Sequence, residues 1–258
     1  MSCVLELLID GRAVGLGVAR LFAMSKCVCL IVTVWCLGGI RCSLADDSQV
    51  SAIVGIVKGR VTYESDKSRP WRYQRYYVKN AKSGELAEAV VALRGRELRN
   101  VPNVEPPVDP TIDQFNFQFV PETTAIRAGQ SIKFTNSDST THNVRSVASI
   151  AEFNFNLEAE DEQTQRFERA GGLRSPVTLG CVYHGGMRAW IYVLDHPFFT
   201  VTKPDGEFEF AGVPPGKYTL EMVHPAGQLR WTQPVEVIVD GTVEVEIRVS
   251  PDQKTLKY

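Results

Sequence analysis

The chain has 258 residues, of which 44% are hydrophobic and 22% are charged, and its formal net charge is -2. This length supports one large domain or two small domains, each with its own core. The charge is close to neutral and the sequence contains no runs of lysine or arginine, which excludes a basic footprint for nucleic acid or anionic membranes. We therefore expect no nucleic-acid partner.

The first 45 residues differ in character from the rest of the chain. Residues 27–40, CVCLIVTVWCLGGI, form a continuous apolar run after Lys26, and this run is shorter than the about 20 residues that cross a bilayer. Small residues follow at both positions that a signal peptidase reads. The segment predicts a secretory signal peptide cleaved after Ala45, and hence a periplasmic or secreted protein with no membrane insertion after cleavage. The alternative is an uncleaved N-terminal membrane anchor. Met24 is itself a natural start for such a signal, and residues 1–23 are then a mis-called start.

The predicted cleavage decides how the cysteines are interpreted. Only Cys181 remains in the mature chain, and a lone thiol in an oxidising compartment is a hazard unless it is buried or bound. The other five of the six cysteines lie before the cleavage site: Cys3, Cys27, Cys29, Cys36 and Cys42.

The first half of the mature chain predicts strands separated by turns. Two strands are expected in residues 53–63 and 86–95, with a polar, aromatic-rich stretch between them. Residues 99–111 carry four prolines and are excluded as a central strand. Residues 124–136 read as a strand, a turn at Gly129 and a second strand.

The second half continues this pattern. Residues 158–169 are highly charged and predict a short helix or a loop. Residues 198–223 predict a pair of strands around Asp205-Gly206 and then a further strand, and residues 235–249 carry the common hairpin signal around Asp240-Gly241. No long helical period is present. The sequence therefore predicts an all-β fold of the sandwich type.

One short segment concentrates metal-binding side chains. Residues 180–190 read GCVYHGGMRAW and place Cys181, His184 and Met187 at a regular spacing of three. Thiolate, imidazole and thioether are soft to borderline ligands, and together they suit copper that cycles between Cu(I) and Cu(II). A trigonal electron-transfer copper site needs a second histidine from elsewhere in the chain.

Three other histidines are candidates for that position. His142 is favoured because it lies just past a predicted strand whose sheet can pack against the cysteine loop. His196 precedes a proline at a domain junction, and we expect it to be structural or exposed. His224 also precedes a proline, and we expect it to be exposed. A zinc site is disfavoured because no second cysteine or histidine pair exists, and the C-x-x-C-H signature of haem c is absent.

The segment from about residue 115 to 194 resembles a cupredoxin of the plastocyanin and amicyanin type. The matching pieces are FQFVPETTAIRAGQSIKFTN, THNV and GCVYHGGM, and the Cys-x2-His-x2-Met spacing is that of amicyanin. The resemblance implies a Greek-key β-sandwich and a hydrogen-bonded tie between the ligand loops through Asn143. It also implies one type 1 copper ion with four ligands: His142, Cys181, His184 and Met187.

The sequence departs from this family directly after the second loop histidine. The family usually has a proline or an aromatic residue there, whereas this chain has Gly185-Gly186. Because glycine widens backbone freedom, the departure leaves open how firmly Met187 is held and what the reduction potential is. It also predicts that the imidazole edge of His184 is open to a close approach by a partner.

The flanking segments resemble a second family, the carboxypeptidase regulatory-like (transthyretin-like) β-sandwich. The resemblance is carried by GIVKGRVTY, AEAVVALRG and FTVTKPDGEFEFAGVPPGKYTLEMV. Since its opening motif precedes the copper segment, we expect the cupredoxin domain (105–196) to be inserted between the two parts of this sandwich, 46–104 and 197–258. A tandem of two β-domains is the alternative.

These observations predict a secreted or periplasmic blue-copper protein that transfers one electron at a time between redox partner proteins, and not an enzyme. Two alternatives stay open. One is a copper carrier or buffer without redox traffic. The other is a surface protein whose sandwich binds a partner or glycan while the copper site is vestigial.

Overall fold

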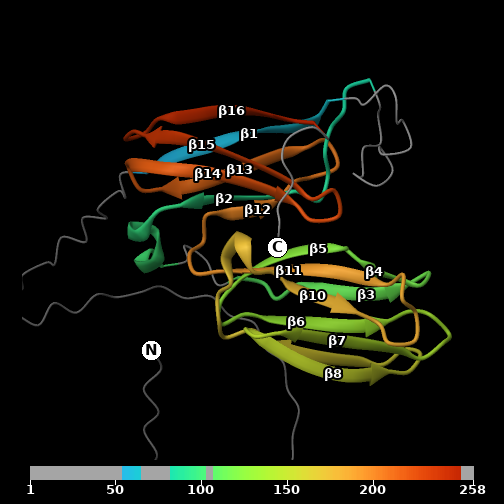
Figure 1. Ribbon diagram of the computed structural model, residues 1–258. Helices are drawn as coiled ribbons and strands as arrows, with labels where there is room; N and C mark the ends of the chain where they lie inside the picture. Colours follow the sequence, from blue (N-terminus) through green and yellow to red (C-terminus); the bar gives the residue numbers. More distant parts are fainter. Residues whose placement is uncertain (1–53, 65–81, 103–106, 251–258) are drawn as a thin grey trace, which may run out of the picture. The chain divides into compact units, whose positions relative to one another are not determined.

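A computed structural model of the protein describes residues 54–64, 82–102 and 107–250 (Figure 1). Within these ranges the regular structure is β-strand, apart from two short 3-10 helices, η1 (Arg96–Asn100) and η2 (Gly172–Arg174). The prediction of an all-β fold is confirmed. The described residues contain no helix that is long and apolar enough to cross a membrane. The predicted signal peptide and its cleavage after Ala45 lie outside the described residues.

Seven strands build one sandwich, which we call the outer sandwich: β1 (Gly55–Tyr63), β2 (Val90–Arg94), β12 (Phe199–Val201), β13 (Glu207–Val213), β14 (Gly216–His224), β15 (Leu229–Val237) and β16 (Thr242–Val249). One sheet has the order β13-β1-β16 and the other has the order β12-β2-β14-β15. Alternate side chains of these strands, such as Val57 and Val61 of β1, are buried in a shared core.

Nine strands build a second sandwich, which we call the inner sandwich: β3 (Thr111–Phe115), β4 (Gln118–Val120), β5 (Thr123–Arg127), β6 (Ser131–Asn136), β7 (His142–Ala148), β8 (Ala151–Leu157), β9 (Glu162–Arg166), β10 (Val177–Gly180) and β11 (Arg188–Leu194). Its sheets have the orders β5-β11-β10-β7-β8 and β4-β3-β6-β9. Ile132 and Phe134 of one sheet share a core with Val144 and Ile191 of the other.

The pairing of the strands shows how the two sandwiches follow each other along the chain. Strand β1 pairs with β13 and β16, and β2 pairs with β12 and β14. Strands β3 to β11 pair only among themselves within the described part of the chain. The inner sandwich therefore interrupts the outer sandwich in sequence. The exact domain limits at residues 105 and 196 stay predictions.

Two hairpins expected from the sequence are wrong. The strands on either side of Asp240-Gly241, β15 and β16, lie in different sheets, and so do β12 and β13 on either side of Asp205-Gly206. Strand β16 instead pairs in parallel with β1. At both Asp-Gly positions the chain does reverse, but the reversal carries it across the core from one sheet to the other.

The charged segment 158–169, expected to be a short helix or a loop, contains strand β9. This strand pairs antiparallel with β6 at the edge of its sheet. Most of its side chains are exposed, and Glu162 forms an ion pair with Lys133 across the two strands. An edge strand with one polar face needs no apolar alternation, because only its backbone joins the sheet.

Candidate metal centre

The cysteine loop is the turn between two paired strands. Strand β10 ends at Gly180, strand β11 begins at Arg188, and these two residues face each other in the antiparallel register. Inside the loop the N–H of Met187 donates a hydrogen bond to the carbonyl of His184, at 2.9 Å. The strand pairing thus fixes both ends of the loop, and the internal hydrogen bond fixes its turn. Cys181 and Met187 are buried, and His184 is partly exposed.

Strand β7 brings His142 to this loop. Its first residue is His142, and it pairs with β10 through Arg145 and Gly180. The side chain of His142 is fully buried. The backbone N–H of the next residue, Asn143, donates a hydrogen bond to Sγ of Cys181 at 3.3 Å. The register between β7 and β10 therefore places the imidazole beside the thiol, although 38 positions separate Asn143 from Cys181 in the sequence.

The donor atoms of three predicted ligands converge on one point. Nδ1 of His142 lies 3.0 Å from Nδ1 of His184, and Sγ of Cys181 lies 3.6 Å from Nδ1 of His184. Donor atoms of the three residues all lie within 4.8 Å of one another. Metal bonds are about 2.0 Å long to nitrogen and about 2.3 Å long to thiolate sulfur. An ion placed between the two Nδ1 atoms, or between Sγ of Cys181 and Nδ1 of His184, can therefore bind both atoms of the pair. The residues present therefore fit a metal ion with a mixed nitrogen and sulfur ligand set.

Met187, the predicted fourth ligand, lies in the same buried cluster as Cys181. Its side chain is 2% exposed, so the two glycines before it do not leave it loose in solvent. A buried thioether in the same cluster as the thiol is the type of weak fourth donor that an electron-transfer copper site uses. Ligation by Met187 stays a prediction.

Asn143 connects the two segments that carry the ligands. Its Oδ1 accepts a hydrogen bond from the N–H of Val182 at 3.4 Å. Its Nδ2 donates to Oδ1 of Asn154, to Oδ1 of Asn156 and to the carbonyl of Phe155, at 2.8 to 3.0 Å. This buried side chain is the tie that the cupredoxin resemblance implied, and it also ties β7 to β8.

Asp138 holds the far side of the His142 ring, and sequence reasoning missed it. Its Oδ2 lies 2.8 Å from Nε2 of His142. Burial raises the pKa of Asp138, but hydrogen bonds from the N–H of Phe117, from the His142 ring and from the N–H of Asn116 outweigh it, so the pKa lies below its ordinary value. The spacing of four residues between Asp138 and His142 was the available signal.

An aromatic ring from another hairpin covers both imidazoles. Phe117 lies edge-on to His142 and to His184, with ring centroids 5.4 Å and 4.9 Å apart. Nothing lies within 4 Å of where a Cβ would stand at Gly185 or Gly186. His184 is partly exposed, and Phe117 packs against its ring, which was not expected from the sequence. An open imidazole edge on the side of the two glycines stays a prediction.

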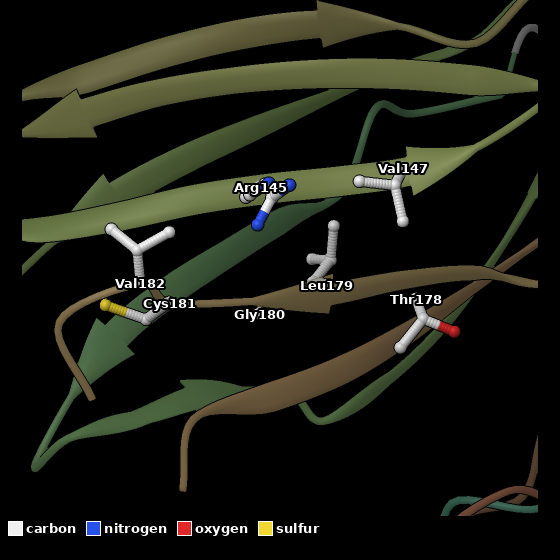
Figure 2. A pocket seen from close by; sticks show the side chains of 7 residues that line it. All are labelled: Arg145, Val147, Thr178, Leu179, Gly180, Cys181 and Val182. Atoms are coloured by element: carbon white, nitrogen blue, oxygen red, sulfur yellow. The ribbon is translucent and has the colours of Figure 1, made fainter. Parts of the chain in front are cut away.

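A shallow pocket lies next to the cysteine on the outside of the sheet (Figure 2). Arg145 and Val147 of β7 line it from one side, and Thr178 of β10 and Val182 of the loop line it from the other, with Cys181 next to Val182. Its lining includes no carboxylate and no histidine.

The other two histidines lie apart from this cluster. His224, expected to be exposed, is fully buried, and that expectation is wrong. Its Nδ1 accepts a hydrogen bond from the N–H of Gly227, at 3.0 Å. His196 is buried too, and its Nδ1 accepts from the N–H of Phe198, at 3.1 Å. Both rings act in local turns that the following proline helps to form.

Comparison with solved structures finds copper proteins that are similar to part of the chain. Amicyanin from Paracoccus versutus is 20% identical over 35% of this chain and 86% of its own, with a TM-score of 0.30. A purple cupredoxin from Nitrosopumilus maritimus is 23% identical over 33% of this chain and 100% of its own, with a TM-score of 0.29.

A third similar structure belongs to a larger protein. A copper-containing nitrite reductase from Thermus scotoductus is 19% identical over 36% of this chain, with a TM-score of 0.31, and the match spans only 24% of that protein. No protein-family model matches the sequence, and the search of curated proteins finds no match. With likenesses this distant, the interpretation of the site depends on its own side chains and distances.

Proposed function

We propose that the inner sandwich binds one copper ion and transfers single electrons between redox partner proteins. The thiolate of Cys181 and Nδ1 of His142 and His184 would hold the ion, and the thioether of Met187 would add a weaker fourth bond. The observation that carries this proposal is the convergence of one sulfur and two imidazole nitrogens within 4.8 Å. Two imidazoles, a thiolate and a weak thioether are the donor set of electron-transfer copper sites.

The surroundings of the site support electron transfer over simple storage of copper. A copper ion held by Cys181, His142 and His184 would supply one-electron redox chemistry. The chain keeps the ligands in place through the β10–β11 register and through Asn143, which is 2% exposed. Ligands that are fixed in this way move little between the two oxidation states, whereas a copper carrier needs ligands that open.

The protein's own groups also limit access to the site. Cys181, His142 and Met187 are buried, and Phe117 covers the two rings. His184 is the partly exposed ligand, so its imidazole edge is the expected exit for the electron. We propose no catalytic step at this site.

Titration of the purified protein with Cu(II) tests the proposal. One equivalent should give intense visible thiolate-to-copper absorption and a narrow copper hyperfine splitting in the electron paramagnetic resonance spectrum. Cys181→Ser should abolish both signals, with a loss of affinity larger than the about 100-fold that loss of an outer-sphere partner costs. An ordinary tetragonal copper signal that is the same in the wild type and in Cys181→Ser would contradict electron transfer and favour a vestigial site.

For the rest of the chain we propose a supporting role and export from the cytoplasm. The outer sandwich has seven strands in two sheets around a separate core, which suits the carboxypeptidase regulatory-like resemblance. Export is supported by the apolar segment 27–40 and the small residues before Asp46. Detection of the mature N-terminus in a periplasmic or culture fraction would test it, and retention of the full leader in membranes would favour an anchor.

A further inference from the structure

Asp138 lies outside the predicted ligand set and still touches one of its members. Its carboxylate accepts three hydrogen bonds: from Nε2 of His142 at 2.8 Å, from the N–H of Asn116 at 2.8 Å and from the N–H of Phe117 at 3.0 Å. Only 13% of the side chain is exposed. Building on the proposed copper function, we propose that Asp138 is a positioning residue that orients His142 for the metal and holds the β3–β4 turn over the site.

The first part of this role follows from which atoms can donate a proton. An ionised carboxylate only accepts hydrogen bonds, so the contact with Asp138 places the ring proton of a neutral His142 on Nε2. The lone pair is then on Nδ1, and Nδ1 is the atom that lies 3.0 Å from Nδ1 of His184. The carboxylate therefore selects the tautomer whose free nitrogen points to the predicted metal position.

The second part concerns the turn that carries Phe117. Asn116 and Phe117 are the two central residues of the β3–β4 hairpin, and both have positive φ, 51° and 59°. This is the type I′ turn geometry, which favours asparagine and glycine and is unfavourable for a bulky residue such as phenylalanine. Two hydrogen bonds from this turn to Asp138 offset that strain and keep the Phe117 ring against both imidazoles.

An asparagine at position 138 cannot accept all three of these hydrogen bonds. All three partners are donors, and they divide between the two carboxylate oxygens: Asn116 bonds to Oδ1, and Phe117 and His142 bond to Oδ2. An asparagine amide has one oxygen and one NH₂ group. In Asp138→Asn the NH₂ group must therefore face at least one donor, although the shape of the side chain is kept.

A carboxylate behind a histidine ligand also affects which copper ion is preferred. The negative charge makes the imidazole more basic and stabilises doubly charged Cu(II) more than singly charged Cu(I). Loss of an outer partner of this kind typically lowers metal affinity about 10–100-fold. We expect Asp138→Asn to lower Cu(II) affinity by this factor and Cu(I) affinity by less.

The copper experiment uses the purified protein, Asp138→Asn and a matched control, Glu160→Gln. Glu160 is an exposed carboxylate on the turn between β8 and β9, so its variant removes the same charge without touching either histidine. Competition with chelators gives the Cu(II) and Cu(I) affinities of all three proteins. We expect Glu160→Gln to bind Cu(II) as tightly as the wild type and Asp138→Asn to bind it more weakly. Equal affinities in wild type and Asp138→Asn would overturn the proposal.

A second readout needs no copper. Nitrogen-15 NMR of the metal-free protein at mildly alkaline pH reports which nitrogen of His142 carries the proton. We expect Nε2–H in the wild type and a changed tautomer balance in Asp138→Asn, with thermal unfolding showing that the variant is folded. A wild-type proton on Nδ1 would refute the positioning role even if copper binds. Failure of the wild type to bind copper, with the proton on Nε2, would instead refute the proposed function.

Discussion

The four histidines of this chain form two pairs, His142 with His184 and His196 with His224, that differ in their surroundings. His142 and His224 are both fully buried. His142 nevertheless lies beside a second imidazole and a thiol, whereas His224 and His196 each accept one backbone N–H in a local turn. Burial therefore does not distinguish a ligand histidine from a structural one. The distinguishing feature is a second soft donor within the reach of a single ion.

The electrostatic setting of the two pairs differs as well. Burial lowers the pKa of His224 to about 4 and also lowers the pKa of His196. Both rings are thus kept neutral as hydrogen-bond acceptors. His142 instead faces a carboxylate, Asp138, whose Oδ2 lies at hydrogen-bond distance from Nε2 of the ring. A buried neutral ring stabilises a turn, while a ring oriented by a carboxylate presents a defined lone pair to a metal.

The largest expected difference between the pairs is in copper affinity. Removing an imidazole ligand in His184→Ala should lower Cu(II) affinity by more than the about 100-fold expected for an outer-sphere partner. His224→Asn keeps an acceptor for the N–H of Gly227 and should leave copper affinity at the wild-type value. Isothermal titration with Cu(II) compares the two variants. An equal loss of Cu(II) affinity in His184→Ala and His224→Asn would show that His184 is not a copper ligand.

The second expected effect concerns His224 and the stability of the fold in acid. The folded-state pKa of His224 lies at about 4, below its ordinary value of 6.5, so only the unfolded chain takes up this proton as the pH falls from 6.5 toward 4. Each pKa unit corresponds to 1.36 kcal/mol, and the free energy of unfolding should fall by about 3 kcal/mol across this window. Above pH 6.5 this group contributes no pH dependence.

Chemical denaturation of the metal-free protein at several pH values measures this loss. His224→Asn should remove the part of the pH dependence between 6.5 and 4 that comes from His224, about 3 kcal/mol, because the variant has no group to protonate at that position. His196, whose pKa is also lowered by burial, is present in both proteins and cancels in the comparison. Other carboxylates titrate in the lower part of the range in both proteins and cancel in the comparison. The same pH dependence in wild type and variant would show that the buried ring does not resist protonation.

The smallest expected effect concerns the glycines beside His184. Neither Gly185 nor Gly186 has a positive φ, and an added Cβ would meet nothing within 4 Å at either position. Gly186→Ala should therefore change the free energy of unfolding by less than about 0.5 kcal/mol and leave the copper spectrum unaltered. Thermal unfolding and the visible spectrum check this. A large shift in either would mean that the loop needs the freedom of glycine.

The local part of the site could be predicted from the sequence, and the part that depends on sheet pairing could not. Cys181, His184 and Met187 lie on one turn, so their spacing alone indicated a shared site. The place of His142 beside these residues depends on the β7–β10 register. The sequence favoured His142 because it follows a predicted strand, and the family resemblance agreed, but neither gives a register. The contact between Asp138 and His142 spans four residues and had a local signal. The position of Phe117 depends on a hairpin that meets the loop before β7, and no local pattern describes that contact.

The fold shows the same limit. Alternating apolar residues correctly predicted strands around Asp205-Gly206 and Asp240-Gly241. The Asp-Gly turns did not show whether the next strand pairs with its neighbour or crosses to the other sheet, because the chain reverses in both cases. The partner of a strand is a long-range choice: β16 pairs with β1, which begins at Gly55, and not with its neighbour β15. Local turn chemistry indicates where the chain reverses and leaves the pairing undecided.

X-ray absorption at the copper edge of the singly loaded protein tests the ligand set most directly. If His142, Cys181 and His184 bind the ion as proposed, the spectrum should show one short copper–sulfur bond and two imidazole nitrogens at about 2.0 Å. The same pattern should persist after reduction to Cu(I), with only small changes in bond length. A first shell of nitrogen and oxygen alone, without a short sulfur bond, would contradict the proposed copper centre.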